Sequence, residues 1–280
     1  MSFQAQSVDN LLSFGDMVPP GDFHSVWSRH ARVVNFAFQE RVLSVGDGSI
    51  CPGPFRICLK DIGIASIERV LVSENEITVN DRIKIPVDPA RRFESGVDLS
   101  FLIPKIIWEN IPILRDLVDE NSAPESLAWL MRDCASAPGG SPFNVVVNTN
   151  LCFAFEHLCS GDIQSAVNGF RGCGIGLTPS GDDFLIGLLL GLGVREISEK
   201  KDLRKIRSLI YKESLAKNLL VNTLLHQSMQ MRPDENWRRL IYAIGGSGEL
   251  ETAGMDVIKH GASSGADTLT GFISAWYINT

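Results

Sequence analysis

The chain has 280 residues, 44% hydrophobic and 21% charged, which is enough to build a sizeable core in one elaborate domain or two coupled lobes. Its formal net charge of −7 argues against nucleic-acid binding, which needs a basic surface to neutralise phosphates. The first 14 residues lack the basic start and apolar run of a signal peptide, and the longest apolar run, 184–194, is too short to cross a bilayer. We therefore expect a cytoplasmic protein without a membrane segment.

Residues 31–103 have the pattern of short β-strands separated by turns. A first pair of apolar runs flanks a polar turn at residues 39–41. Further short apolar runs follow at residues 55–59, 70–72, 77–79 and 83–87. This spacing favours an antiparallel barrel-like or sandwich-like lobe. Residues 1–20 are expected to form an irregular leader, and residues 123–133 a short helix.

After residue 143 the apolar residues recur at intervals of three and four, which predicts helices. The expected helices cover residues 153–158, 163–170, 182–197, 203–225, 236–244, 249–259 and 266–278. A segment rich in Pro and Gly, residues 137–142, is the expected linker. The sequence therefore predicts an α+β protein, with a β-rich lobe over residues 1–142 and a helical lobe over residues 143–280.

The helical lobe contains one internal repeat. Residues 180–187 (SGDDFLIG) and 264–271 (SGADTLTG) share Ser, Gly, Asp, Leu and Gly at a constant offset of 84 residues. Each copy is predicted to start a helix, with the serine as N-cap and the shared aspartate at the third helical position, where a carboxylate suits the positive end of the helix dipole.

The last glycine of each copy predicts how the two helices meet. Gly187 and Gly271 fall two turns into their helices, where a missing side chain lets another helix approach closely. We expect the helices to cross there, at or below the usual interaxial distance of roughly 8–10 Å. Both N-termini would then open at one mouth, with Asp183 and Asp267 facing each other.

Two versions of the chemistry fit these helix starts. Glycine-dense backbone over residues 172–176 is suited to presenting N–H groups to an anion, although it is neither a dinucleotide fingerprint nor a Walker loop. In the first version, amides and hydroxyls of the helix starts bind a phosphate or carboxylate directly. The residues expected to bind this anion are Gly174, Gly176, Thr178, Ser180, Gly181, Ser263, Ser264 and Gly265.

In the second version the aspartates hold a cation. Asp182, Asp183 and Asp267 can supply oxygen ligands to Mg²⁺, with phosphate completing the shell. Three carboxylates repel an anionic substrate unless a cation intervenes, so an anionic ligand favours the metal. The same three aspartates are the expected catalytic residues. The spacing shows no Ser-His-Asp set and no Cys-His pair.

Both copies also carry a resemblance to a known family. Residues 174–183 (GIGLTPSGDD) resemble the first signature of the AllH family, and residues 260–269 (HGASSGADTL) resemble its second. The region 34–59, with its Pro-Gly-Pro element, is similar in a looser way. The family usually has Gly-Pro-Gly where this chain has Gly-Ile-Gly at residues 174–176, which predicts a less rigid loop.

The resemblance implies a place in allantoin catabolism, a branch of purine degradation. Members of the family are a component of oxamate carbamoyltransferase, which converts oxalurate and phosphate into oxamate and carbamoyl phosphate. It also implies partner subunits, namely an acyl-CoA-synthetase-like subunit and a second large subunit. The site residues that it implies are Gly176, Thr178, Ser180, Gly181, Asp182, Asp183, Ser264, Gly265 and Asp267.

The expected function is therefore that of a cytoplasmic carbamoyltransferase subunit that binds an anionic substrate or phosphate at paired helix N-termini. It would have no nucleic-acid partner and no membrane partner. The alternative is a non-catalytic subunit that binds a small anion or serves assembly, because no nucleophile–base pair can be identified from spacing.

Overall fold

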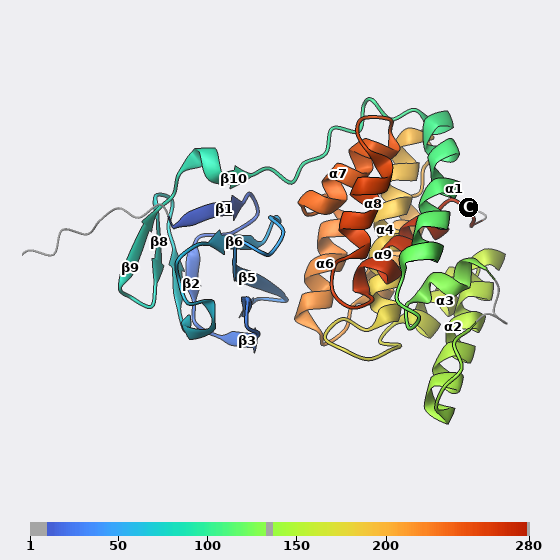
Figure 1. Ribbon diagram of the computed structural model, residues 1–280, viewed down its shortest axis with the longest axis horizontal. Coiled ribbons are helices and arrows are strands. Elements are labelled where there is room, and N and C mark those ends of the chain that lie inside the picture. The colour runs from blue at the N-terminus through green and yellow to red at the C-terminus, as the bar shows by residue number, and fades with distance from the viewer. Residues whose placement is uncertain (1–9, 133–136, 279–280) are drawn as a thin grey trace, which may run out of the picture. The chain divides into compact units, whose positions relative to one another are not determined.

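A computed structural model describes residues 10–132 and 137–278. Strands fill the N-terminal part and helices the C-terminal part, so the predicted α+β class is confirmed (Figure 1). The chain forms two compact units. The first runs to Gly96 and also includes Pro233–Glu235, and the second comprises Val97–Arg232 and the residues from Asn236 onward.

The first unit is built from two sheets. The larger has the strand order β10-β1-β6-β5-β4-β3 and the smaller β2-β7-β8-β9. The strands are β1 Leu11–Gly15, β2 Gly21–Phe23, β3 Val26–Arg29, β4 Val33–Phe38, β5 Arg41–Asp47, β6 Arg56–Leu59, β7 Val70–Val72, β8 Glu76–Val79, β9 Ile83–Pro86 and β10 Arg92–Phe93. Apolar side chains of both sheets form one core, and the sheets do not close into a barrel within the described residues. Of the two predicted architectures, the sandwich-like lobe agrees better with the structure than the barrel-like one.

Most strands lie where the apolar runs predicted them. The turn expected at residues 39–41 joins β4 to β5, with Gln39 in the left-handed region at φ 50°. The expected irregular leader is wrong for β1, because Leu11 is buried and the strand pairs with both β6 and β10. Residues 1–9 of that leader lie outside the described part of the chain.

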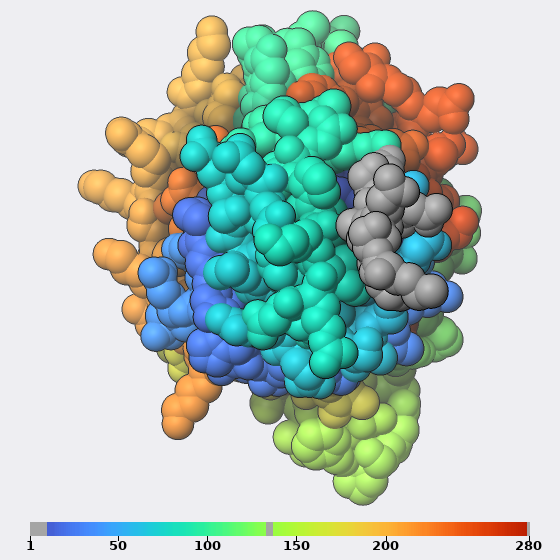
Figure 2. All heavy atoms as spheres, turned by 90° about the vertical axis from the view of Figure 1, so that its left-hand side faces the viewer, coloured from blue at the N-terminus to red at the C-terminus, as the bar shows by residue number. Residues whose placement is uncertain are grey.

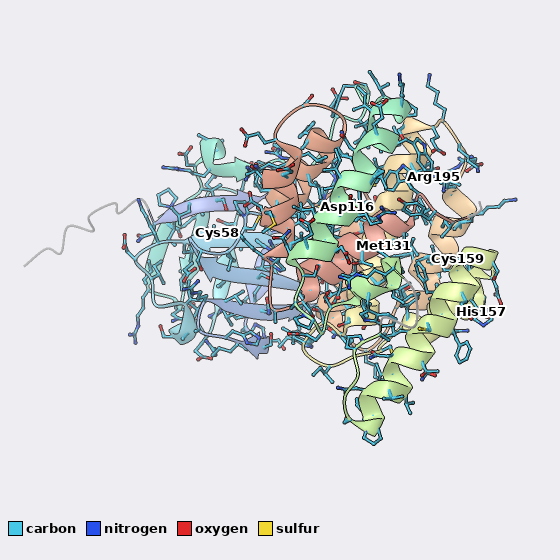
Figure 3. The ribbon with its side chains drawn as sticks, turned by 45° about the vertical axis from the view of Figure 1, so that its right-hand side comes forward. Cys58, Asp116, Met131, His157, Cys159 and Arg195 are labelled. Carbon is cyan, nitrogen blue, oxygen red and sulfur yellow. The ribbon has the colours of Figure 1, made fainter. Side chains whose placement is uncertain are left out.

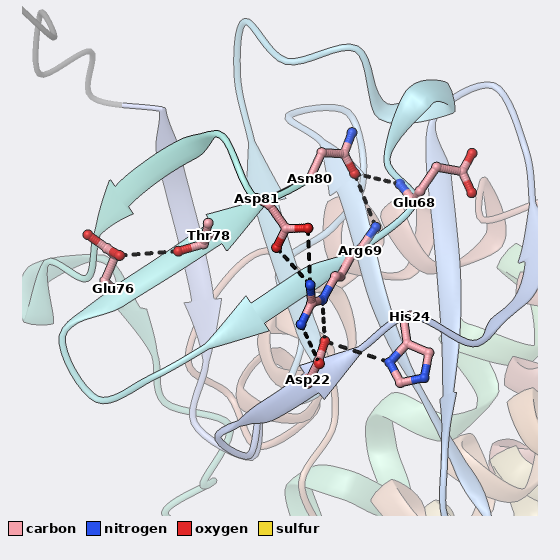
Figure 4. Close-up of polar contacts among 8 residues, drawn as sticks. All are labelled: Asp22, His24, Glu68, Arg69, Glu76, Thr78, Asn80 and Asp81. Carbon is pink, nitrogen blue, oxygen red and sulfur yellow. Dashed lines mark hydrogen bonds and ion pairs between the residues drawn. The ribbon is translucent and has the colours of Figure 1, made fainter.

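Polar contacts tie the smaller sheet together at its turns. The Arg69 guanidinium donates to Asp22 on β2 at 2.6 Å and to Asp81 in the turn after β8 at 2.9 Å (Figure 4). The Asn80 side chain accepts from the backbone amide of Glu68 at 2.7 Å. Figure 2 shows the region of β7 to β9, in cyan and teal, at the surface of this unit. These contacts are exposed, so we assign them to local order of the hairpin and not to a site.

The second unit is helical. Its helices are α1 Pro104–Asn121, α2 Pro142–Ser160, α3 Ile163–Phe170, α4 Ser180–Ser198, α5 Arg204–Ser214, α6 Leu219–Met229, α7 Glu235–Ile244, α8 Leu250–Ile258 and α9 Ser264–Ser274, with a 3₁₀ turn η3 at Leu127–Met131. The helix α4 is buried on nearly all sides, and α9 lies beside it in the same core (Figure 1).

Arg195 fixes the far end of this helix pair. It lies in the last turn of α4, is 8% exposed, and donates to the carbonyl oxygen of Ala275, just past α9, at 2.7 Å. A second bond reaches Ile278 at 3.2 Å (Arg195 is labelled in Figure 3). Carbonyl groups at a helix end lack intrahelical partners, so a buried guanidinium there both satisfies them and suits the negative end of the dipole.

Four features of this region differ from the sequence-based prediction. The helix α1 was not predicted, and its buried face (Ile107, Ile111, Leu114 and Val118) belongs to the helical core. The units therefore divide at Gly96, whereas the sequence placed the division after residue 142. The single helix expected over residues 203–225 is two, α5 and α6, because Asn218 caps a new start. The short helix expected over 123–133 is the turn η3, and residue 133 lies outside the described part.

None of the helices in the described residues is long and apolar enough to cross a membrane.

Candidate ligand site at the α4–α9 crossing

The repeat corresponds to two copies of one helix hairpin, α3–α4 and α8–α9. In each copy the helix start is tied to the loop before it: the Gly181 amide donates to the Cys173 carbonyl at 2.8 Å, and the Gly265 amide to the His260 carbonyl at 2.9 Å. Both glycines are needed for this packing. A Cβ on Gly181 would lie 2.0 Å from the Phe170 carbonyl oxygen, and a Cβ on Gly265 would lie 2.0 Å from that of Val257.

The two long helices of these hairpins cross through their repeated glycines. A Cβ on Gly187 would lie 1.7 Å from the Thr268 carbonyl oxygen, and a Cβ on Gly271 would lie 1.9 Å from the Phe184 carbonyl oxygen. Phe184 and Thr268 are themselves equivalent in the repeat, so the two contacts are reciprocal and the helices are related by a local two-fold. The predicted crossing at the glycines is confirmed.

The two helix starts consequently meet. The Thr178 hydroxyl, just before α4, lies 3.2 Å from the Ser264 hydroxyl, the first residue of α9. The same Thr178 hydroxyl donates to the Asp183 carboxylate at 3.0 Å. The side chain of Ser264 acts on the pKa of Asp183, and that of Ser180 acts on the pKa of Asp267. The serine of each repeated helix start therefore lowers the pKa of the aspartate on the other helix.

This cross-pairing replaces the capping that the sequence predicted. Pro179 and Ser263 are the N-caps, and Ser180 and Ser264 are the first residues inside their helices. Neither start has a side-chain cap hydrogen bond, so the predicted capping box is wrong. The serine hydroxyls are turned across the crossing, where a purely structural cap would have turned them to its own helix.

The polar groups lie in two layers. Asp183 and Asp267 are 3% and 0% exposed, which places both carboxyls beneath the surface. The hydroxyl-bearing residues above them are half-buried, namely Thr178, Ser180, Ser263 and Ser264. The crossing therefore brings four half-buried hydroxyl-bearing residues together with two buried acids.

Burial raises the pKa of both acids. Loss of water around Asp183 raises its pKa well above 3.8, and the charge of Asp267 raises it further, against the Ser264 and Thr178 hydroxyls. Burial also raises the pKa of Asp267, to about 6, although the Leu127 amide and the hydroxyls of Ser180 and Ser263 oppose the shift. Burial therefore favours the protonated form of both acids relative to an exposed aspartate.

Asp182 does not take part in this pair. Its carboxylate accepts a hydrogen bond from the Gly172 amide at 2.8 Å and so holds the glycine loop. Burial raises its pKa as well. The described part of the chain contains no group of three or more His, Cys, Asp or Glu side chains placed to hold a metal ion. The three aspartates predicted as ligands of Mg²⁺ are thus not brought together as one set.

The glycine loop before α4 is an exposed rim. Gly174 and Gly176 adopt φ values of 117° and 106°, which side chains rarely tolerate. A Cβ on Gly174 would also lie 2.8 Å from the Ser180 backbone nitrogen, so this position packs directly against the helix start. The side chain of Ile175 is 82% exposed. Gly174 and Gly176 were predicted to bind the anion, and in the structure their conformation sets the course of the loop.

Two contacts of the site were missed by sequence reasoning. The Leu127 backbone amide, in the turn η3, donates to Oδ1 of Asp267 at 2.6 Å. A backbone amide has no sequence signature, so no pattern could have identified it. The Asn218 side chain donates to the Leu177 carbonyl in the glycine loop at 2.7 Å, and it also caps α6. An asparagine before an apolar run is a helix-start signal, so this residue could have been found.

The region that forms this site matches a known family. No solved structure matches the chain. Residues 170–276, which span both repeated helix starts, match the model described as oxamate carbamoyltransferase subunit AllH. The suspected resemblance is confirmed for residues 170–276, which are similar to the AllH family.

Proposed function

We propose that this chain is a cytoplasmic subunit of an oxamate-carbamoyltransferase-like enzyme and that the α4–α9 crossing holds its small anionic substrate. The observation that carries this proposal is the meeting of two equivalent helix starts, with Thr178 and Ser264 in contact at 3.2 Å above the two buried acids. The family description supports the reaction class and the presence of other subunits.

The groups present suit carbamoyl transfer between oxalurate and phosphate. A phosphate oxygen forms a bond to the carbamoyl carbon, the bond from that carbon to the oxamate nitrogen breaks, and the nitrogen takes up the proton that phosphate loses. The Ser180 and Ser264 hydroxyls can turn from the acids and donate to substrate oxygens as charge develops on them, whereas the Thr178 hydroxyl donates to Asp183. Asp183, whose pKa burial raises, is placed to pass the proton to the leaving nitrogen as a general acid.

The amides of the helix starts contribute through the dipole more than through direct bonds. The Gly181 and Gly265 amides donate to loop carbonyls, and the Asp183 and Asp267 amides donate to the carbonyls of Pro179 and Ser263. Two parallel N-terminal ends still present a positive potential to an anion. The hydroxyls are therefore the groups that can bind the anion directly. The sequence had predicted that both the amides and the hydroxyls bind it.

The test is a kinetic comparison of the purified chain alone and of the complex that co-purifies with it. We expect the chain alone to form little carbamoyl phosphate from oxalurate and phosphate, and the complex to turn over. In the complex, Asp183→Asn should lower kcat by about a hundredfold or more, the usual range for loss of a general acid. The exposed Asp116→Asn on α1 is the matched control and should leave kcat unchanged.

A cation is tested in the same preparation. Binding of phosphate is measured by calorimetry with Mg²⁺ and with EDTA. Equal affinity for phosphate under both conditions would show that binding does not require Mg²⁺.

The alternative, a subunit that binds a small anion without catalysing transfer, is favoured by one observation. Both acids are almost fully buried, at 3% and 0% exposure, so substrate reaches them only if the loop opens. A complex in which Asp183→Asn weakens ligand binding but leaves kcat intact at saturating substrate would establish this alternative.

A further inference from the structure

One oxygen at the base of the crossing has no partner. Oδ2 of Asp267 is buried, and no described residue meets hydrogen-bond geometry with it, although the nearby Ser180 and Ser263 hydroxyls lower the pKa of the carboxyl. Oδ1 of the same carboxyl accepts from the Leu127 amide at 2.6 Å. Asp267 is 0% exposed, so water does not compensate from bulk solvent. A buried acceptor left unsatisfied costs about 1–3 kcal/mol, and more when it is charged, which is a strong demand for a donor.

We propose that Oδ2 of Asp267 accepts an N–H of the ligand, so that the crossing takes hold of the amide end of its substrate and not of a carboxylate or phosphate end. This inference rests on the proposed function and adds to it the orientation of the substrate. An anionic oxygen brought to the same place would meet a like charge in a water-poor environment, where repulsion is strong. An amide nitrogen carries the donor that the oxygen lacks.

The repeat shows that this feature is specific to one of the two acids. Asp183 occupies the equivalent position on α4, but its Oδ2 already accepts from the Thr178 hydroxyl at 3.0 Å. Asp183 thus accepts from a side-chain hydroxyl, that of Thr178, whereas Asp267 accepts from a backbone amide, that of Leu127. Asp267 is therefore the acid of the pair that has an acceptor left for a ligand N–H.

The Leu127 amide also makes the orientation testable by one substitution. In Asp267→Asn the side-chain oxygen remains opposite the Leu127 N–H, which can only donate. The amide nitrogen then takes the place of Oδ2, and the acceptor becomes a donor. The variant should therefore reverse the preference of the site, a change of sign that general loss of stability cannot produce.

The probes are oxamate and oxalate, two anions of nearly the same shape. They differ by an NH₂ group in place of one carboxylate oxygen, and therefore also by one negative charge. Calorimetric titration of the full chain at pH 7.5 measures both affinities. Wild-type protein should bind oxamate at least tenfold more tightly than oxalate, the difference of about one charge-assisted hydrogen bond. Asp267→Asn should bind oxalate more tightly than oxamate.

Asp183→Asn is the matched control, because it makes the same chemical change at the equivalent position of the repeat. It leaves Oδ2 of Asp267 unchanged, so the preference for oxamate should persist within about threefold. Circular dichroism of all three proteins confirms that they are folded.

The possible outcomes distinguish this inference from the proposed function. Equal affinity of the wild-type protein for oxamate and oxalate overturns the assignment to Asp267 and leaves the proposed function standing, and this comparison needs no variant. Binding of neither probe overturns both. A folded Asp267→Asn protein that still prefers oxamate shows that the N–H is recognised elsewhere.

Discussion

Gly187 of α4 packs directly against the carbonyl oxygen of Thr268 on α9, at a place where a Cβ would lie 1.7 Å from that oxygen. The obstacle is backbone in the middle of a helix, which cannot rotate away as a side chain can. This contact sets how closely the two helices approach, and through it the distance between the two helix starts.

Gly187→Ala should therefore destabilise the protein by about 3 kcal/mol, the upper part of the range for overpacking. The gain of up to about 1 kcal/mol in helix propensity will not offset it. Denaturant unfolding at constant pH measures the change.

Gly193→Ala on the same helix is the control. A Cβ there would lie 2.1 Å from the sulfur of the flexible Met231 side chain, which can move aside, and 3.0 Å from the Arg207 guanidinium. We expect its free energy of unfolding to stay within about 1 kcal/mol of the wild type. Two variants of equal stability would show that the crossing is looser than described.

The stability of the protein should depend on pH through Asp267. Burial raises its folded pKa from 3.8 to about 6, so the folded state holds a proton that the unfolded chain has released. Stability is then fully present below pH 3.8 and is lost as pH rises through about 6. The loss from this group is about 3 kcal/mol, and Asp183, whose pKa is also raised, adds to it in the same direction.

Asp267→Asn removes the group and should flatten this dependence. The free energies of unfolding of wild type and variant are compared from pH 4 to pH 8. The wild type should lose about 3 kcal/mol more than the variant over this range. Parallel curves would mean that Asp267 is not held in a raised-pKa environment.

Asn218 links the glycine loop to α6 through two separable contacts. Its Oδ1 caps the helix by accepting from the Leu220 and Val221 amides, and its Nδ2 donates to the Leu177 carbonyl at 2.7 Å. Asn218→Asp keeps the acceptor and removes the donor, whereas Asn218→Ala removes both.

We expect Asn218→Ala to lower stability by about 1 kcal/mol through the lost cap and Asn218→Asp to lower it by less. Both should increase hydrogen exchange and proteolysis around Ile175, because the loop has lost its tie. A loop that stays equally protected in Asn218→Asp would show that the Leu177 contact does not hold it.

The sequence predicted the crossing because its information is local and periodic. Two glycines at the same depth of two repeated helices indicated a close approach, and Gly187 and Gly271 make it. The strands over residues 70–72, 77–79 and 83–87 were predicted for the same reason, since alternating apolar residues between turn signals leave few alternatives.

Long-range contacts set the limits of prediction. The helix α1 was missed because Pro112 lies inside it and proline usually ends a helix. The serine caps were wrong because Ser180 and Ser264 find partners on another helix, which no local pattern shows. The Leu127 amide, 140 residues from Asp267 along the chain, could be found only from the fold.

The central claim, that the α4–α9 crossing holds the amide end of the substrate, is tested most directly by a crystal structure of the chain with oxamate. We predict that the ligand binds among Thr178, Ser180 and Ser264, with its amide nitrogen about 2.9 Å from Oδ2 of Asp267. Oxamate bound away from these helix starts, or bound there with its carboxylate toward Asp267, would contradict it.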